Sequence, residues 1–195
     1  VVWASAAYDV YKRLLSIPAI MDQEHLFLCS PSCSGKTLTA FLTIIDQLVR
    51  RALDNKLDKR VYCVYISPIK ALANDIQRNL IGPLTEISET YLPSRAQEIR
   101  VGRRTGATPQ SERQKMLRNP PHILITTPES LAIAITSPRF QPIVSEVEYM
   151  IVDELHSLVP SKRGVHLALT LSYLDTLLTR PVQRIGISAT MEPLE

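Results

Sequence analysis

Short apolar runs alternate along the chain with longer stretches in which apolar residues recur every three or four positions. The short runs predict buried strands at 25–29, 61–66, 99–101, 122–126, 147–152 and 183–188. The longer spacing predicts helices over 3–17, from Lys36 to a polar loop at 53–60, from Ala71 to an end near Gly82-Pro83, and over 110–118, 128–136 and 163–178. This alternation is typical of βαβ units, so the sequence predicts one α/β domain with a mostly parallel central sheet and helices on both faces.

The turn between the first strand and its helix has the composition of a phosphate-binding loop. Its sequence is Ser30-Pro31-Ser32-Cys33-Ser34-Gly35-Lys36-Thr37. A helix N-terminus offers unpaired N–H groups and a positive dipole end to phosphate oxygens. Lys36 would reach the β- and γ-phosphates, and the Thr37 hydroxyl would bind Mg²⁺. The alternative is a Ser-rich N-cap before an ordinary helix, which an acidic partner farther along the chain makes less attractive.

That acidic partner is Asp153-Glu154, which directly follows the strand predicted at 147–152. The carboxyl ends of strands are where open α/β sheets bind ligands. Asp153 would hold Mg²⁺, and Glu154 would orient or deprotonate the attacking water. Two carboxylates after a strand can also be a solvated turn, but the same edge of the sheet already carries the predicted phosphate loop. The two segments together predict hydrolysis of a nucleoside triphosphate.

With Asp153-Glu154-Leu155-His156 in place, the chain resembles the first RecA-like domain of a superfamily 2 helicase of the DExH kind, which implies a RecA-like P-loop NTPase fold. Three further segments resemble helicase motifs in order. Motif Ia is resembled by Ser67-Pro68-Ile69-Lys70-Ala71-Leu72, motif Ib by Arg104-Thr105-Gly106 with Thr126-Thr127-Pro128-Glu129-Ser130-Leu131, and motif III by Ser188-Ala189-Thr190. The stretches 66–80, 105–113, 123–131 and 162–171 are similar to the large helicase-related (Lhr) group, with Ski-type RNA helicases as near neighbours.

This resemblance implies a set of ligands and partners. The ligands are ATP and Mg²⁺, and the partners are single-stranded DNA or RNA and a second RecA-like domain of the same full-length chain, which would supply arginine fingers. The full-length protein would move 3′-to-5′ along the strand. His156 would relay between the nucleotide site and Ser188, Ala189 and Thr190; the alternative is a packed histidine whose hydrogen bonds are satisfied. The chain departs from the family pattern at Cys33, where Gly is usual, and at Ser30, where Ala or Gly is usual.

The segments that resemble motifs Ia and Ib are candidate contacts for a nucleic-acid backbone, because each occupies the turn after a strand and opens a helix. The candidates are Pro68, Lys70, Ala71, Arg104, Thr105, Gly106, Thr127, Pro128, Glu129 and Arg163. Thr127-Pro128-Glu129 also has the composition of an ordinary helix N-terminus, with a cap, a proline and an early acid. For Arg163 a surface salt bridge is as good an interpretation as a contact with a strand.

Composition limits the remaining possibilities. The net charge is +3, from 22 basic and 19 acidic residues, which is compatible with nucleic acid but does not argue for it. The three cysteines do not form a disulfide framework or a zinc site. The start of the chain does not resemble a secretory signal, and no apolar run is long enough to span a membrane, so we expect an intracellular protein, in the cytoplasm or the nucleus. The absence of an initiator Met predicts a fragment or a processed chain, with residues 1–195 forming a single helicase ATP-binding domain.

Two other functions remain open from the sequence. The first is a degenerate module that binds nucleic acid or a partner without hydrolysing ATP, as Cys33 could indicate. The second is a translocase for double-stranded DNA within the same superfamily. Nucleic-acid-stimulated ATP hydrolysis by the full-length protein would separate the first of these from a helicase.

Overall fold

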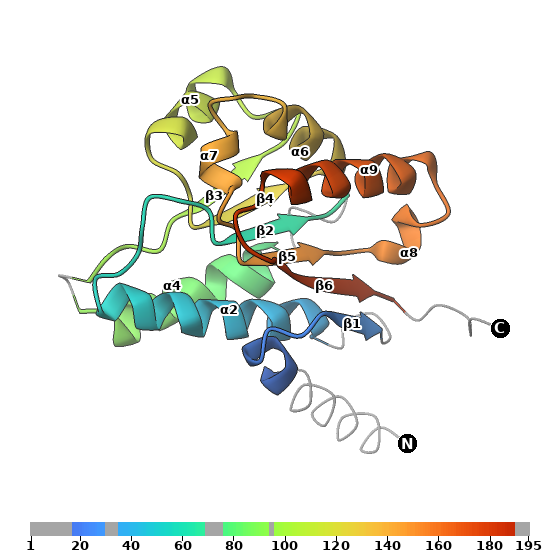
Figure 1. The fold of residues 1–195 in the computed structure, drawn as a ribbon. Coiled ribbons are helices and arrows are strands. Elements are labelled where there is room, and N and C mark those ends of the chain that lie inside the picture. Colours follow the sequence, from blue (N-terminus) through green and yellow to red (C-terminus); the bar gives the residue numbers. More distant parts are fainter. Residues whose placement is uncertain (1–16, 30–34, 69–75, 94–95, 190–195) are drawn as a thin grey trace, which may run out of the picture.

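Six parallel strands form one sheet within residues 17–29, 35–68, 76–93 and 96–189, the part of the chain that the computed structural model describes (Figure 1). They are β1 (Leu26–Cys29), β2 (Cys63–Ile66), β3 (Val101–Arg104), β4 (Ile123–Thr126), β5 (Tyr149–Val152) and β6 (Gln183–Ser188). Their order across the sheet is β1-β6-β5-β2-β4-β3, and each neighbouring pair is parallel. The predicted fold class is therefore confirmed. The predicted third strand, 99–101, begins two residues and ends three residues before β3 does.

Helices cover both faces of this sheet (Figure 1). One face carries α2 (Lys36–Leu53), the π-helix η2 (Gln77–Ile81) and α4 (Gly82–Tyr91); the other carries α5 (Gln110–Arg118), α6 (Pro128–Ile135), α7 (Gln141–Val144) and α9 (Lys162–Leu177). The short helix α8 (Leu155–Leu158) follows β5 directly. No helix in the described part of the chain combines the length and the apolar composition that crossing a bilayer requires.

Alternation along the strands divides the core into two layers. On β2, Cys63 and Tyr65 belong to the core against α2, whereas Val64 and Ile66 belong to the core on the opposite face. β5 alternates in the same way, with Tyr149 and Ile151 on the α2 side. Successive side chains of a strand point to opposite faces, and a strand buried on both faces is therefore apolar throughout. The next residue on the α2 side of β5 is position 153.

One predicted boundary is wrong. We expected the helix that starts near Ala71 to end at Gly82-Pro83, but the chain stays helical through α4 to Tyr91. The residues before Gly82 form the π-helix η2, and the Gly82 N–H donates to the carbonyl of Gln77, five residues earlier. Proline normally breaks a helix because it lacks an N–H and its ring meets the carbonyl of residue i−4. Here Pro83 lies in the first turn of α4, directly after the wider π turn. The chain therefore continues as α4 where we expected the helix to end.

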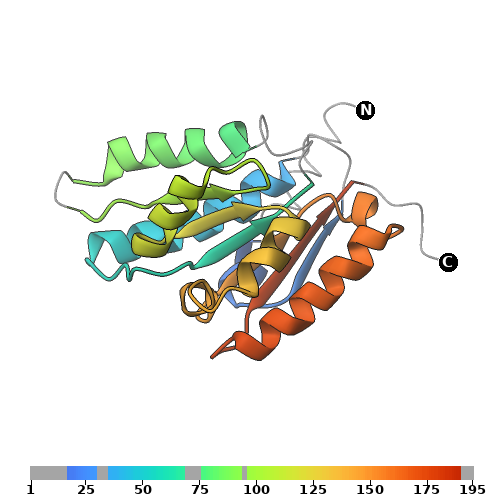
Figure 2. The same ribbon diagram turned by 90° about the horizontal axis from the view of Figure 1, so that it is seen from above.

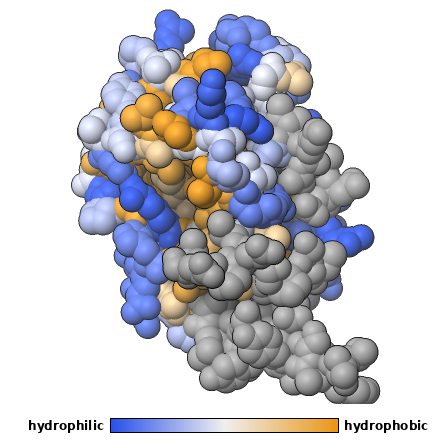
Figure 3. All heavy atoms as spheres, turned by 90° about the vertical axis from the view of Figure 1, so that its right-hand side faces the viewer, coloured by the Kyte–Doolittle hydropathy of each residue, from blue (hydrophilic) through white to orange (hydrophobic). Residues whose placement is uncertain are grey.

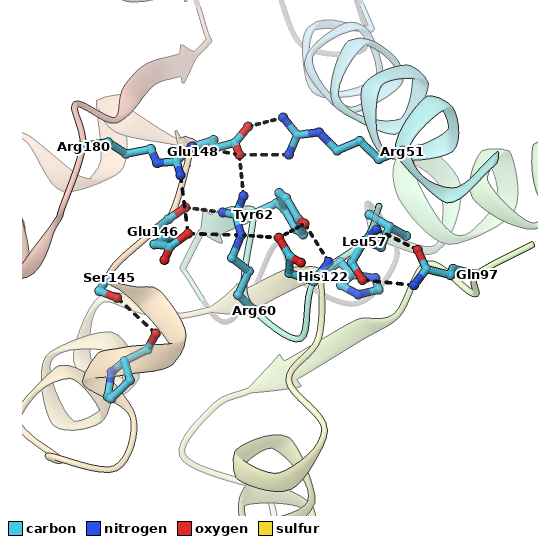
Figure 4. A network of polar contacts seen from close by, with 12 residues as sticks. Arg51, Leu57, Arg60, Tyr62, Gln97, His122, Ser145, Glu146, Glu148 and Arg180 are labelled. Atoms are coloured by element: carbon cyan, nitrogen blue, oxygen red, sulfur yellow. Dashed lines mark hydrogen bonds and ion pairs between the residues drawn. The ribbon is translucent and has the colours of Figure 1, made fainter. Parts of the chain in front are cut away.

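The two edges of the sheet have different characters. In Figure 2 the strands run the same way, so that their carboxyl ends meet at one edge and their amino ends at the other. A network of charged groups holds the amino edge together (Figure 4). At its centre, Glu148 accepts two hydrogen bonds from Arg51 at 2.9 and 2.7 Å and one from Arg60 at 2.7 Å. Arg180 approaches the same carboxylate at 3.5 Å, and Arg60 stacks 3.8 Å from the ring centroid of Tyr62.

This network joins the end of α2, the loop before β2, the start of β5 and the loop before β6. Glu148 is only 7% exposed at its side chain. Burial alone raises the pKa of this carboxyl group, but the hydrogen bonds from Arg51 and Arg60 outweigh burial and leave the pKa below its usual value. Glu148 therefore stays ionised, and removing one of its arginines would leave a buried charge poorly compensated.

His122 lies at the same edge and makes the fold sensitive to acid. It precedes β4, is 1% exposed, and accepts the Arg100 N–H at its Nδ1 atom at 3.1 Å. Burial, and next the charge of Arg100, lower the pKa of this imidazole from 6.5 to about 4. The folded chain therefore resists a proton that the unfolded chain accepts readily.

We predict that folding stability falls as the pH is lowered from 6.5 to about 4. In this range the unfolded chain binds more protons than the folded one, and the His122 contribution is at most roughly 3 kcal/mol. His122→Asn removes the titrating group, so its stability should depend less on pH. Urea unfolding at pH 7 and pH 4.5 measures the difference between the two proteins. Equal pH dependence in both would assign the effect to other groups.

Candidate functional site

The candidate site lies at the carboxyl edge of the sheet, where a long-range hydrogen bond joins two of its predicted residues. The Thr37 hydroxyl donates to Asp153 Oδ2 at 3.0 Å and joins segments 116 residues apart. Thr37 lies in the first turn of α2, which begins after Gly35 in the left-handed conformation, with φ of 77°. Glycine adopts this conformation without a steric penalty, so the loop can turn directly into the helix. Thr37 and Asp153, both predicted Mg²⁺ ligands, are thus brought together.

Strand order explains how these two segments meet. β1 precedes the loop to Thr37 and β5 precedes Asp153, and β6 lies between these two strands. Asp153 follows the α2-facing residues of β5 in the alternation, so its carboxylate turns toward the helix that carries Thr37. Ser188 at the end of β6 pairs with Cys29 at the end of β1. The segment that resembles motif III therefore sits between the two predicted halves of the nucleotide site.

Three described donors fix the Asp153 carboxylate, which is 6% exposed. Besides Thr37, the Tyr65 hydroxyl donates to Oδ2 at 2.6 Å, and the Glu154 N–H donates to Oδ1 at 2.7 Å. Tyr65 was not among the predicted site residues. In the sequence it resembles any other apolar-run tyrosine, and only the pairing of β2 with β5 brings it to Asp153.

Glu154 has an unusual backbone conformation. Its φ of 56° and ψ of 38° lie in the left-handed region, which non-glycine residues seldom adopt. This residue turns the chain from β5 into α8, and its strain is of the kind that clusters at functional sites. The left-handed turn keeps the Glu154 side chain near the start of α8, where its Oε2 lies 3.0 Å from Nε2 of His156.

His156 connects Glu154 to the end of β6. The Ala189 N–H donates to Nδ1 of His156 at 3.3 Å, and the Ser188 hydroxyl lies 3.3 Å from the same atom. A backbone N–H can only donate, so Nδ1 carries a lone pair and the neutral ring holds its proton on Nε2. That proton points to Glu154 Oε2. The chain of contacts Glu154–His156–Ala189 thus has the connectivity expected of a relay. Thr190, the third residue of the segment that resembles motif III, lies outside the described residues.

The oxygen donors of this site suit Mg²⁺. Because the Thr37 proton is directed at Asp153, the lone pairs of the Thr37 oxygen remain for a cation. Mg²⁺ is commonly held by one or two protein oxygens together with substrate phosphates and water. The described residues contain no cluster of three or more His, Cys, Asp or Glu side chains that could hold a metal by themselves.

The ends of β2, β4 and β3 form the other half of the edge, where contacts with nucleic acid were predicted. Ile66 pairs with Thr126, and Thr126 pairs with Arg104, so these three strands end level. Pro68 follows β2 and Thr127 follows β4. Figure 3 faces the carboxyl edge and shows hydrophilic and apolar side chains interspersed on it. Ser30–Ser34, Lys70 and Ala71 lie outside the described residues.

The Thr127-Pro128-Glu129 segment is a helix N-terminus, as its composition allowed. Thr127 is the N-cap of α6 and accepts the Ser130 N–H at its side chain at 3.3 Å. Pro128 occupies the first turn, and Glu129 places a carboxylate in that turn. Residues 127 and 128 are buried, with 1% of Thr127 exposed. The capping role is therefore established by the geometry, and a contact with a phosphate would be additional to it.

Arg104 is placed less favourably for contact with a strand than the sequence suggested. It is 9% exposed, and its guanidinium carbon lies 4.9 Å from the ring centroid of Phe140. Burial, and next the charge of Arg113, lower the pKa of this guanidinium. The neighbouring turn is held by Arg113, which was not predicted: its side chain donates to the carbonyls of Thr105, Gly106 and Thr108 at 3.2, 3.1 and 2.9 Å.

Arg163 forms the salt bridge that was one of its two interpretations. Its Nε donates to Glu129 Oε1 at 2.6 Å, across the packed helices α6 and α9. Both side chains are nearly half exposed, at 45% and 46%. The hydrogen bond from Arg163 is the main reason that the pKa of the Glu129 carboxyl lies below its usual value. Two residues predicted to contact nucleic acid therefore neutralise each other's charge in this structure.

Comparisons with known proteins agree with this geometry. The family model described as DEAD/DEAH box helicase matches residues 13–195. The chain belongs to the DEAD/DEAH box helicase family. It is 49% identical over 196 residues to the ATP-dependent helicase Lhr-Core of Methanocaldococcus jannaschii. The aligned region covers 98% of this chain and 23% of that protein. It is also 53% identical over 181 residues to the Lhr-Core helicase of Methanothermobacter thermautotrophicus. That aligned region covers 91% of this chain and 21% of that protein.

A solved helicase has the same fold. The structure of Mycobacterium smegmatis helicase Lhr bound to ssDNA and AMP-PNP superimposes with a TM-score of 0.76 and 45% sequence identity, covering 90% of this chain and 22% of that one. The predicted first RecA-like domain of superfamily 2, and its likeness to the Lhr group, are confirmed by these matches. The chain spans about a fifth of the length of these relatives.

We predict that Gly164→Ala destabilises this part of the domain, because Gly164 lies where α9 passes the end of α8. A Cβ atom at Gly164 would lie 2.3 Å from the Leu158 carbonyl oxygen, so the backbone must shift. The expected loss is about 1–3 kcal/mol in the free energy of unfolding. Gly106→Ala is the control, because a Cβ atom there meets nothing within 4 Å. Urea unfolding of both variants tests this, and wild-type stability in Gly164→Ala would contradict it.

Proposed function

We propose that residues 1–195 are the ATP-binding domain of an ATP-dependent, Lhr-like helicase that moves 3′-to-5′ along a single strand of DNA or RNA. The observation that carries the proposal is the hydrogen bond between Thr37 and Asp153, which unites a phosphate-loop residue with the acidic residue after β5. Further support comes from the relatives named ATP-dependent helicase and from the solved relative whose title includes ssDNA and AMP-PNP.

In this proposal ATP binds at the start of α2. The first N–H groups of α2 and its positive dipole end face the phosphates, together with the loop of residues 30–34. Lys36 places an ammonium beside the β- and γ-phosphates, and Thr37 and Asp153 hold Mg²⁺. When bound, Mg²⁺ neutralises charge that develops on the phosphate oxygens. The preference for adenine is assigned from the family alone, because no segment before the loop resembles an adenine-reading motif.

Hydrolysis is assigned to Glu154, and its coupling to movement is assigned to His156. Glu154 orients the attacking water and accepts a proton from it. Its carboxylate also accepts the Nε2 proton of His156, which reaches the end of β6 through the Ala189 N–H. A displacement of Ser188 and Ala189 would therefore change the orientation of Glu154. This is a route by which strand contacts and the nucleotide state could influence each other.

The whole protein would need more than this domain. A second RecA-like domain would close over the nucleotide and supply arginine fingers, which in related NTPases raise the rate by about 10³–10⁵. The turns after β2, β3 and β4 would provide one part of the track for the strand. Contacts from backbone N–H groups and small hydroxyls carry little sequence information, which suits a protein that moves along nucleic acid.

We predict that Lys36→Ala and Glu154→Gln fail at different steps in the intact protein that carries this domain. Lys36→Ala removes the cation beside the γ-phosphate, so both ATP binding and ATP turnover should be lost. Glu154→Gln keeps the shape of the site but loses the base, so ATP should still bind while turnover falls at least about a hundredfold. Fluorescent-nucleotide binding and a steady-state ATPase assay with single-stranded DNA or RNA measure both steps. Normal turnover in either variant would remove that residue from the mechanism.

The Arg163–Glu129 ion pair gives a separate prediction for binding of the strand. If Arg163 meets a phosphate, Arg163→Gln should weaken single-strand affinity several-fold and reduce the salt dependence of binding by about one ion. Glu129→Gln, which releases Arg163 from its partner, should leave affinity unchanged or increase it. Fluorescence anisotropy at several salt concentrations measures both. Equal, small effects of the two variants would identify the pair as a surface salt bridge, for which a contribution of about 0–1 kcal/mol to stability is usual.

A further inference from the structure

Among the described residues, Tyr65 is the one buried hydroxyl that contacts the predicted metal-binding carboxylate from outside the predicted motifs. It is fully buried, at 0% exposure, and its ring packs 5.0 Å from the ring of Phe41 on α2. Its neighbour on the adjacent strand is Ile151, two residues before Asp153. Alternation places Tyr65, Ile151 and then Asp153 on the α2 side of the sheet. The hydroxyl consequently meets Asp153 Oδ2 at 2.6 Å.

The hydrogen bonds of Asp153 show what this hydroxyl does. A carboxylate offers about four lone-pair positions, two on each oxygen. Oδ2 accepts from both Thr37 and Tyr65, and Oδ1 accepts from the Glu154 N–H. Among the described residues, these three donors leave one position, on Oδ1. The carboxylate is thereby fixed in rotation by donors on both of its oxygens.

Thr37 alone would fix this orientation less firmly. Its hydroxyl lies at the start of a helix that follows the phosphate loop, and in the proposed function its oxygen also serves the cation. Tyr65 belongs instead to β2, directly beside β5, and its ring is held by Phe41. A short hydrogen bond to an ionised acceptor is among the stronger kinds in proteins. Tyr65 is therefore the donor that the packed core of the sheet holds in place.

We propose that Tyr65 is a positioning residue for Mg²⁺: its hydroxyl holds the Asp153 carboxylate in the orientation in which it would bind the cation. This inference rests on the proposed function, because it needs a nucleotide-bound Mg²⁺ at Thr37 and Asp153. Tyr65 acts on the cation through Asp153. Loss of the Tyr65 hydroxyl should lower the affinity of the nucleotide complex for Mg²⁺. It should leave the binding of nucleotide without the metal unchanged.

The test compares Tyr65→Phe with Tyr149→Phe in the intact protein. Tyr149 is a matched control: it is 1% exposed, lies on β5 in the same core layer, and donates its hydroxyl to Gln47 rather than to Asp153. Each variant removes one buried hydroxyl and keeps the ring. Binding of a fluorescent ATP analogue is titrated with Mg²⁺ and is also measured in EDTA, and thermal unfolding of the nucleotide-free proteins is recorded beside it.

For Tyr65→Phe we expect the apparent Mg²⁺ dissociation constant to rise roughly tenfold, the loss typical of one hydrogen bond to a charged group. Binding in EDTA should match wild type, and Tyr149→Phe should match wild type in both titrations. An unchanged or tighter Mg²⁺ dependence in Tyr65→Phe, beside normal Mg²⁺ dependence in the wild-type protein, would overturn the positioning role alone. A wild-type protein whose nucleotide binding ignores Mg²⁺ would overturn the proposed function and this inference with it.

Discussion

The hydrogen bond from Thr37 to Asp153 depends on a sheet in which every described strand runs the same way. Only parallel strands bring the loop after β1 and the turn after β5 to one edge, and crossover helices are the price of that arrangement. Inserting β6 between β1 and β5 then places Ser188 beside both segments. Three stretches that are far apart in sequence meet because of strand order, before any side chain adds specificity.

The same order divides the edge into two working halves. β1, β6 and β5 carry the predicted nucleotide site. β2, β4 and β3 carry the residues predicted to contact a nucleic-acid strand. β2 and β5 are neighbours at the boundary. Tyr65 extends from β2 to Asp153, directly after β5, and β2 ends one residue later at Ile66, before Ser67 and Pro68. The two halves are therefore joined by one short strand and not by a flexible segment.

Sequence predicted most of the elements because buried parallel strands and amphipathic helices have strong apolar patterns. It failed where the answer lies in tertiary structure. Pro83 predicted a helix end, yet the π-helix before it lets α4 begin there. Arg104 was a candidate for phosphate contact, and only the folded chain shows it over Phe140. Tyr65 could not be separated from the other core tyrosines, since its distinction is the register of β2 against β5.

The position of charge in the molecule follows from what each edge must do. At the amino edge, Glu148 is surrounded by Arg51 and Arg60, and these buried bonds are expensive to break singly. At the carboxyl edge, Glu154 and His156 are each more than a third exposed, and Glu154 is held in a left-handed turn. An edge that must admit a ligand cannot satisfy all of its polar groups internally. The rigid amino edge fixes the ends of the strands, and so the carboxyl edge can keep its geometry while its polar groups remain accessible.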